Sequence, residues 1–244
     1  MFKDYSELLV EKANSLLNIN LSDQSVDELC VYGDMLLEWN QKFNLTSITE
    51  PSEVIIKHFV DSLAFINYIS QIFPSLYFKY ADIGTGAGFP AIPLKIVRPE
   101  LEIVLIDSLA KRLTFLNEVI STLKFDKIST DHGRVEDFGH NCNYRSSFDL
   151  VTARAVAELP VLIEFAVPLL KVGGYFFAAK GSNPEEEIGH SRNALKMLNS
   201  EVVNIFKYSL GPKAENRSFV VIKKLSDTLA KYPRKAGIPK KNPL

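Results

Sequence analysis

Asp82-Ile83-Gly84-Thr85-Gly86-Ala87-Gly88-Phe89 is the stretch that decides the fold of this chain. An extended-looking run at residues 76–81 precedes it, and a helix is expected at residues 90–97. A strand, a glycine-rich turn and a helix in this order bring bare backbone close to a nucleotide-like ligand. Glycine suits such a turn because it accepts positive φ and has no Cβ to hold the ligand away.

The spacing within the turn indicates the kind of ligand. The three glycines follow G-x-G-x-G, not the dinucleotide pattern G-x-G-x-x-G. A diphosphate binds at a helix N-terminus, but Phe89-Pro90 puts an aromatic ring there. A cofactor with an adenosine and no diphosphate is favoured, and S-adenosylmethionine (SAM) is the most common one. The alternative is that the turn only forms a tight corner between the strand and the helix. A corner alone does not explain why three of five residues are glycine.

The composition suits one α/β domain with an appendage, or two small domains. The chain has 244 residues, 46% of them hydrophobic and 23% charged, and a formal net charge of −1. Cys30 and Cys142 lie far apart, so we expect neither a zinc site nor a disulfide framework, and no metal. No apolar signal region or membrane-spanning stretch is expected, and the cysteine usage fits a reducing cytoplasm.

The pattern of apolar residues divides the chain into three parts. Residues 1–75 are expected to form a helical extension packed on the core, and residues 226–244 a basic, proline-containing tail. Between them, residues 76–225 alternate strands with helices, which implies a parallel sheet with helices on both faces. Strands are expected at residues 76–81, 102–107, 127–130, 148–154, 175–179, 202–208 and 218–224. The short link between the last two strands makes that pair antiparallel.

This pattern predicts the α/β fold of SAM-dependent methyltransferases, a Rossmann-like sheet of about seven strands, five of them parallel with an antiparallel final pair. In such a sheet the ligand lies across the carboxyl ends of the strands. We expect the glycine turn to pass under the methionine part and the ribose, and the acid that ends the second strand to accept from the ribose hydroxyls. The candidate cofactor residues are therefore Gly84, Gly86, Phe89, Asp107, Val135, Glu136 and Arg154.

Two of these residues have alternative roles. Asp107 could instead cap the helix that follows it, and Arg154 could form a surface salt bridge instead of pairing with a carboxylate of SAM or the substrate. His58, Asp61 and Ser62 share one helical segment, but a hydrolase triad needs members that converge from separate elements. No catalytic residue is assigned from the sequence.

The end of the chain is basic although the whole chain is nearly neutral. From residue 223 to residue 244 there are seven basic residues against one acid, Asp227. A flexible tail of this kind suits contacts with a phosphate backbone, and the alternative is a merely solvated tail. The cofactor pocket is expected to be built without the tail. The candidate nucleic-acid contacts are Lys111, Arg112, Lys180, Arg234 and Lys235, with Lys231, Lys240 and Lys241 as further tail residues.

Several motifs together closely resemble the bacterial glucose-inhibited division protein B family, almost from end to end. They are Asp82-Ile-Gly-Thr-Gly-Ala-Gly-Phe-Pro, Asp107-Ser108 with Lys111-Arg112, Thr152-Ala-Arg-Ala-Val, Tyr232-Pro-Arg-Lys, Asn44-Leu-Thr and His58-Phe-Val-Asp-Ser. The resemblance implies a cytoplasmic SAM-dependent methyltransferase acting on a guanine N7 of 16S ribosomal RNA. It implies SAM contacts at Gly84, Phe89, Val135, Glu136 and Arg154.

The implied substrate is 16S ribosomal RNA or the small ribosomal subunit, and a monomer is expected. Guanine N7 has an exposed lone pair and needs no deprotonation, so no strong general base is required. The A-form major groove is narrow, so the target should lie in a loop or be flipped out. Two alternatives stay open: a SAM-dependent methyltransferase of another substrate, and a nucleotide-binding regulator that has lost catalysis.

Overall fold

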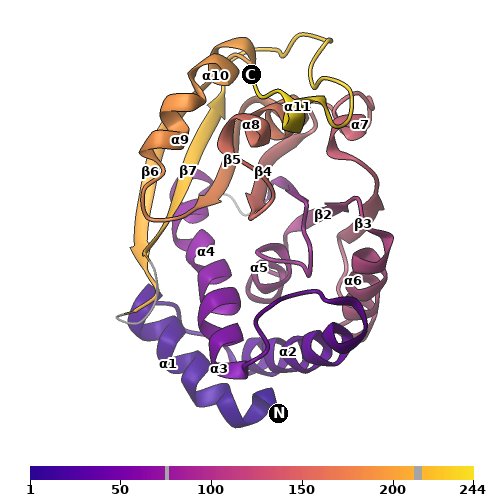
Figure 1. Ribbon diagram of the computed structural model, residues 1–244. Helices are drawn as coiled ribbons and strands as arrows, with labels where there is room; N and C mark the ends of the chain where they lie inside the picture. The colour runs from indigo at the N-terminus through magenta and orange to yellow at the C-terminus, as the bar shows by residue number, and fades with distance from the viewer. Residues whose placement is uncertain (75–76, 212–215) are drawn as a thin grey trace.

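The chain folds around a seven-stranded sheet with helices on both faces, as the computed structural model in Figure 1 shows. The structure describes residues 1–74, 77–211 and 216–244. The strand order is β3-β2-β1-β4-β5-β7-β6, in which β1 to β5 are parallel and β7 runs antiparallel to both β5 and β6. The predicted fold class, with five parallel strands and a final antiparallel pair, is confirmed.

The strands follow the predicted runs closely. They are β1 (Lys79–Ile83), β2 (Glu102–Asp107), β3 (Ile128–His132), β4 (Phe148–Arg154), β5 (Leu170–Lys180), β6 (Ser200–Ser209) and β7 (Asn216–Lys224). The start predicted for β1, at residue 76, lies outside the described residues. The start predicted for β5 at Tyr175 is wrong: Leu170 already pairs with Phe148 of β4 across a bulge, so the glycine pair 173–174 lies within the strand.

The helices cover the two faces of this sheet. They are η1 (Phe2–Tyr5), α1 (Ser6–Leu17), α2 (Asp23–Phe43), α3 (Pro51–Val54), η2 (Ile55–Val60), α4 (Asp61–Ile72), α5 (Ala91–Val97), α6 (Ala110–Thr122), α7 (Val135–Phe138), α8 (Leu159–Ala166), η3 (Val167–Leu169), α9 (Glu185–His190), α10 (Arg192–Met197) and α11 (Ile238–Lys241). α9 and α10 follow each other directly and are divided at Ser191.

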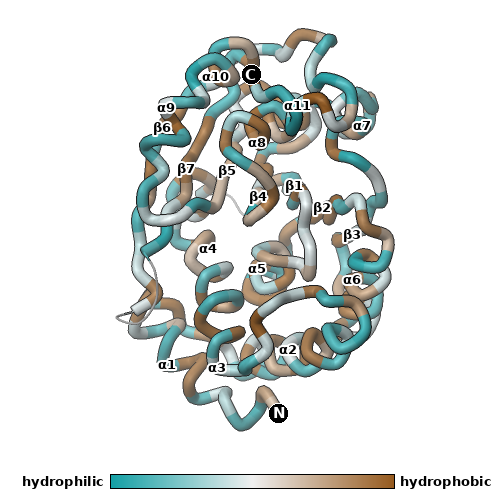
Figure 2. The backbone as a smooth tube through the Cα atoms, in the orientation of Figure 1, coloured by the Kyte–Doolittle hydropathy of each residue, from teal (hydrophilic) through white to brown (hydrophobic). Residues whose placement is uncertain are grey.

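Two apolar cores lie on opposite faces because successive residues of a strand point to opposite sides. In β2, Ile103 and Leu105 join the core formed with the N-terminal helices, α5 and α6. Val104 and Ile106 join the second core, under α8 and α10. Figure 2 shows the central strands as apolar stretches, typical of a sheet that is covered on both faces.

The N-terminal helices pack directly on the sheet. α2 begins with Ser22, which accepts from the Ser25 N–H at 3.1 Å, and ends at Asn44 in the left-handed region. Its last helical residue is therefore Phe43. α3, η2 and α4 form one continuous run whose middle turn is π-helical, a geometry that is frequent at functional sites. The division of the chain into three domains stays a prediction, and its boundary at residues 75 and 76 lies outside the described residues.

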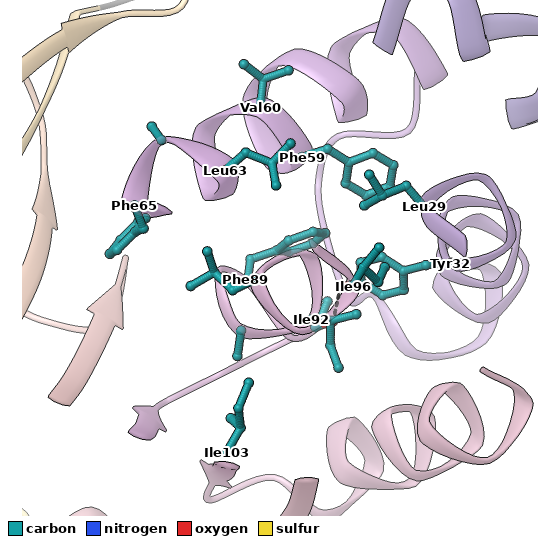
Figure 3. Close-up of a cluster of buried hydrophobic side chains, with 14 of the residues drawn as sticks. Leu29, Tyr32, Phe59, Val60, Leu63, Phe65, Phe89, Ile92, Ile96 and Ile103 are labelled. Carbon is teal, nitrogen blue, oxygen red and sulfur yellow. Dashed lines mark hydrogen bonds between the residues drawn. The ribbon is translucent and has the colours of Figure 1, made fainter. Parts of the chain in front are cut away.

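An aromatic cluster joins the N-terminal helices to the glycine turn (Figure 3). Tyr32 of α2 is fully buried and stacks on Phe59 and Phe115, with ring centroids 5.6 and 6.3 Å away. Its hydroxyl donates to the backbone oxygen of Ala87 at 2.5 Å. The same ring contacts Phe89, so one side chain of the helical extension holds two positions of the turn.

The C-terminal tail is not the flexible segment that its prolines and lysines predicted. Arg145 donates to the backbone oxygens of Thr228 and Tyr232, at 2.6 and 2.7 Å, and Tyr232 and Pro239 are buried. The expectation of a flexible tail is wrong because a distant arginine supplies the donors that the irregular backbone needs.

We predict that Tyr32→Phe lowers the free energy of unfolding by about 1–3 kcal/mol, the cost of leaving a buried acceptor without its donor. Chemical denaturation of both proteins measures this difference. Tyr68→Phe is the control, since the Tyr68 hydroxyl makes no hydrogen bond to any described residue and its ring stacks on Phe206 at 4.1 Å. Equal destabilisation of the two variants would contradict the role given to the Ala87 contact.

Candidate functional site

The glycine turn lies at the carboxyl end of β1 and is fixed on β2. The N–H groups of Gly84 and Thr85 both donate to the backbone oxygen of Ile106, at 2.8 and 3.2 Å. A Cβ at Gly84 would lie 2.6 Å from Val156, and one at Gly88 would lie 2.5 Å from Ile92. At Gly86, which has a φ of 62°, the nearest atom to a Cβ is 3.9 Å away, so the turn offers bare backbone there to a ligand.

Asp107 holds this turn in place from the end of β2. It is buried, and its Oδ2 accepts from the N–H of Gly86 at 2.9 Å and from Nη1 of Arg112 at 3.2 Å. Its Oδ1 accepts from the N–H of Leu109, just ahead of α6, at 2.9 Å. The N-cap of α6 is Leu109 and has no side-chain cap, so Asp107 fixes the residue ahead of the helix and is not its cap. The role as acceptor for the ribose hydroxyls stays a prediction.

A small cavity of about 60 Å³ lies beside Asp107. Its lining brings together four of the predicted cofactor residues and six residues that were not predicted as cofactor contacts. The lining residues that matter below are Gly84, Asp107, Val135 and Glu136, together with Val156, Phe165 and Lys240. This is the position expected for the adenosine of SAM, between the ends of β2 and β3.

Arg154, at the end of β4, is at the centre of the other half of the site. Its Nη1 donates to Oδ2 of Asp61 at 2.8 Å, and its guanidinium lies 4.9 Å from the centre of the Phe89 ring. Asp61 is 4% exposed, and its Oδ1 accepts from the Tyr208 hydroxyl at 2.6 Å. The alternative of a surface salt bridge is wrong for Arg154, because the ion pair is buried. Pairing with a carboxylate of SAM stays a prediction.

His58 completes this cluster as a neutral imidazole. Its ring stacks on Phe89 at 4.5 Å, and its Nδ1 lies 3.1 Å from Nη2 of Arg154. The same Nδ1 lies 3.1 Å from the backbone oxygen of Lys57, so it is placed between a donor and an acceptor, and these contacts are compatible with either neutral tautomer. Nε2 lies 2.8 Å from the Thr46 hydroxyl. Burial and the nearby Arg154 charge lower the pKa of His58 to about 3.

A cavity of about 350 Å³ opens next to this cluster, within the size range of small-molecule sites. Its lining includes the basic side chains of Lys57, Lys180 and Arg217. It also includes the carboxylate of Asp61 and the hydroxyl of Tyr208. Arg154, Ala155 and Ala157 line this cavity, whereas Val156 lines the smaller one. The segment after β4 therefore separates the two cavities.

Asp82, the acid two residues ahead of the first glycine, is fully buried. Its Oδ1 accepts from the Thr152 hydroxyl at 2.5 Å, which ties β1 to β4 at the switch point of the sheet. Burial raises the pKa of this carboxyl to about 7. Its other oxygen is buried and has no hydrogen-bond partner among the described residues.

The five predicted nucleic-acid contacts have different surroundings. Lys111 and Lys235 are exposed, and Arg112 pairs with Asp107. Lys180 is 8% exposed and donates to Glu187 at 2.6 Å. Arg234 pairs with Glu164, which the sequence did not indicate. Arg112, Lys180 and Arg234 therefore already have carboxylate partners, and the nucleic-acid contacts stay a prediction.

Sequence reasoning missed four residues of this site: Thr46, His58, Asp61 and Tyr208. His58 and Asp61 share one helical segment with Ser62. The structure does not join these three residues into a hydrolase triad. Their partner, Arg154, lies 93 residues from Asp61 along the chain. The signals available were the polar pair His58 and Asp61 at i, i+3 and the motifs Asn44-Leu-Thr and His58-Phe-Val-Asp-Ser. In the described parts of the chain, no group of His, Cys, Asp and Glu could hold a metal ion, and no helix could cross a membrane.

We predict a pH-dependent stability difference between the wild type and His58→Gln. An unfolded histidine takes up a proton below about pH 6.5, whereas His58 in the folded chain stays neutral down to about pH 3. The stabilisation by neutral His58 is therefore complete above about pH 6.5 and is lost as the pH falls.

Denaturation should be measured at pH 6.5 and at pH 5. Between these two values the free energy of unfolding of the wild type should fall by about 2 kcal/mol relative to that of the variant, at about 1.4 kcal/mol per pH unit. The raised pKa of Asp82 acts in the opposite direction in both proteins, so only the difference between them reports on His58. A difference that does not change with pH would contradict the neutral assignment.

Comparisons with known proteins agree with this geometry. Residues 25–218 match the family model described as GidB, rRNA small subunit methyltransferase G. The "Ribosomal RNA small subunit methyltransferase G" of Desulfitobacterium hafniense is 53% identical over 244 residues, covering 100% of both chains. The protein of the same name from Acetivibrio thermocellus is 48% identical, covering 98% of this chain and 96% of its own.

A solved structure with a similar fold is the 16S rRNA (adenine(1408)-N(1))-methyltransferase of Catenulisporales acidiphilia, a mutant with cosubstrate SAM. It aligns with a TM-score of 0.52 at 14% identity, covering 67% of this chain and 92% of its own. At that identity the likeness shows the fold alone. The family match and the full-length relatives show more: this chain belongs to the GidB family, rRNA small subunit methyltransferase G.

Proposed function

We propose that the chain transfers the methyl group of SAM to N7 of a guanine in 16S ribosomal RNA, acting as a monomer in the cytoplasm. The observation that carries the proposal is the pair of cavities that meet at the segment after β4. One lies at the end of β2 beside the glycine turn, and the other lies between Arg154 and the basic side chains. The segment of Ala155 and Val156 lies between the two cavities, so the donor and acceptor sites are neighbours at the carboxyl ends of the strands.

The residues on the donor side fit SAM. Gly86 leaves open space where a Cβ would stand, and Asp107 fixes the N–H of that glycine. Val135 and Glu136 line the position of an adenine, and Arg154 supplies a guanidinium that can pair with a carboxylate. When bound, SAM supplies a sulfonium methyl group that a nucleophile can attack.

The residues on the acceptor side fit a nucleophile that needs no base. His58 is neutral, and both of its ring nitrogens face other side chains, Arg154 and Thr46. Asp61 already accepts from Arg154 and Tyr208. Guanine N7 carries its lone pair in the ring and needs no proton removed, so orientation is the main requirement, and it can supply about 7–11 kcal/mol. The cationic product would be stabilised by the Asp61 carboxylate more than by the lysines at the rim.

The direct test incubates the purified chain with methyl-tritiated SAM and small-subunit RNA, and then digests the RNA to nucleosides. Tritium is expected in 7-methylguanosine. RNA that already carries the modification, isolated from a strain with the enzyme, is the control and should take up no label. Tritium in another nucleoside would overturn the N7 assignment, and label in a protein fraction alone would overturn the RNA substrate.

We predict that Gly86→Ala weakens SAM binding at least tenfold, because the added Cβ would occupy the open side of the turn. The positive φ also strains alanine, by about 1–2 kcal/mol. Gly173→Ala is the matched control, since Gly173 has a φ of 85°, is equally open and lies within β5, away from the predicted cofactor residues. Both variants should lose similar stability, and isothermal titration should show weaker SAM binding only for Gly86→Ala. Equal SAM affinity in the two would contradict the assignment of the turn.

We predict that replacing the exposed Lys111 and Lys235 by alanine weakens RNA binding. The slope of log affinity against log salt should become shallower by about 0.7–0.9 for each phosphate that is no longer neutralised. Lys124→Ala is the control, because that exposed lysine follows the far end of α6, away from the carboxyl ends of the strands. Filter binding at several salt concentrations measures the slopes. An unchanged slope in the double variant would place the RNA elsewhere on the chain.

A further inference from the structure

The C-terminal segment, residues 232–241, lies against the cavity assigned to the adenosine. Lys240 lines that cavity together with Gly84, Asp107 and Glu136. The N–H of Gly237 donates to Oε1 of Glu136 at 2.9 Å, and Glu136 is buried. Figure 1 shows α11 beside α8 and close to α7, the short helix that carries Val135 and Glu136. Part of the cavity wall is therefore supplied from the end of the chain.

One ion pair fixes this segment to the body of the protein. Arg234 donates to Glu164 through its backbone N–H at 2.7 Å, through Nε at 2.9 Å and through Nη2 at 2.6 Å. Glu164 is completely buried on α8, and the next residue, Phe165, lines the same cavity. A buried carboxylate is stable only when it is paired, so the pair fixes both the segment and α8 at this point.

The start of the segment is held as closely. The Nε2 of His140 lies 2.6 Å from the backbone oxygen of Pro233. A Cβ at Gly139 would lie 2.6 Å from the ring of Pro233, so this ring packs directly on the backbone of Gly139. These contacts hold the segment where Lys240 lines the cavity and Gly237 contacts Glu136, another residue of the lining.

We propose that residues 232–241 form part of the cofactor-binding site, with Lys240 as a wall of the adenosine pocket. Arg234 and Glu164 are positioning residues that hold this wall and set the affinity for SAM. The inference rests on the proposed function and corrects the expectation that the pocket is built without the tail. In this proposal the positive charge of Arg234 pairs with Glu164 and so supports the cofactor site. The neighbouring Lys235 is exposed and can make other contacts.

A matched pair of substitutions tests the wall. Lys240 and Lys241 are adjacent and exposed and carry the same charge, but only Lys240 lines the cavity. Isothermal titration of the full-length chain with SAM should show Lys240→Ala binding about threefold to tenfold more weakly than the wild type. Lys241→Ala should bind with the wild-type affinity.

A second set of variants tests the positioning pair. Arg234→Leu combined with Glu164→Gln removes both charges together and leaves no unpaired charge in the core. This variant should remain folded, as circular dichroism would show, and should bind SAM at least tenfold more weakly. Arg234→Lys in the wild-type background keeps a charge opposite Glu164. This variant should therefore keep much of the SAM affinity that the double variant loses.

Hydrogen exchange of the wild-type chain gives a readout independent of any substitution: added SAM should slow the exchange of the Gly237 amide. The inference is overturned if the wild type binds SAM while Lys240→Ala and the Arg234/Glu164 variant bind equally well. It is also overturned if Lys241→Ala loses as much affinity as Lys240→Ala. A wild type that binds no SAM would overturn the cofactor site itself, and this inference with it.

Discussion

The architecture of the site depends on Arg154, a half-buried arginine whose carboxylate partner, Asp61, is buried. A guanidinium loses its hydration at the end of β4, and the protein replaces it with contacts from separate elements. Asp61 begins α4, and the His58 ring and the backbone oxygen of Lys57 come from the π-helical turn before it. The face of Phe89 comes from the glycine turn. Removing one partner of such a buried ion pair costs about 3–5 kcal/mol, so Arg154 fixes the N-terminal helices, the turn and β4 relative to one another.

Acidic side chains have supporting roles throughout this edge of the sheet. The carboxylate of Asp107 accepts from the Gly86 N–H and from the start of α6, and that of Asp61 accepts from Arg154 and Tyr208. Asp82 ties β1 to β4 through Thr152. The surface left for a ligand consists largely of bare backbone in a fixed position. Such a surface suits a reaction in which positioning contributes more than proton transfer.

The sequence predicted the fold because the signals for it are local. β2 and β4 have the predicted bounds, since each is a short apolar run that ends on a charged residue before a helix or a turn. The residues at strand ends were predicted to lie together for the same reason: in a parallel sheet, all the carboxyl ends lie at one edge. The contacts of Arg154 and Arg234 could not be found in this way, because Asp61 and Glu164 lie 93 and 70 residues away along the chain.

The central claim is that Arg154, as held by Asp61, forms the cofactor end of the site. A double-mutant cycle on SAM affinity tests it directly, using Asp61→Asn in the wild-type chain and in Arg154→Lys. Asp61→Asn should weaken SAM binding markedly in the wild-type background and have little further effect once Arg154 has been replaced, because both changes disturb the same guanidinium. An equal effect of Asp61→Asn in both backgrounds, or no effect in either, would contradict the claim.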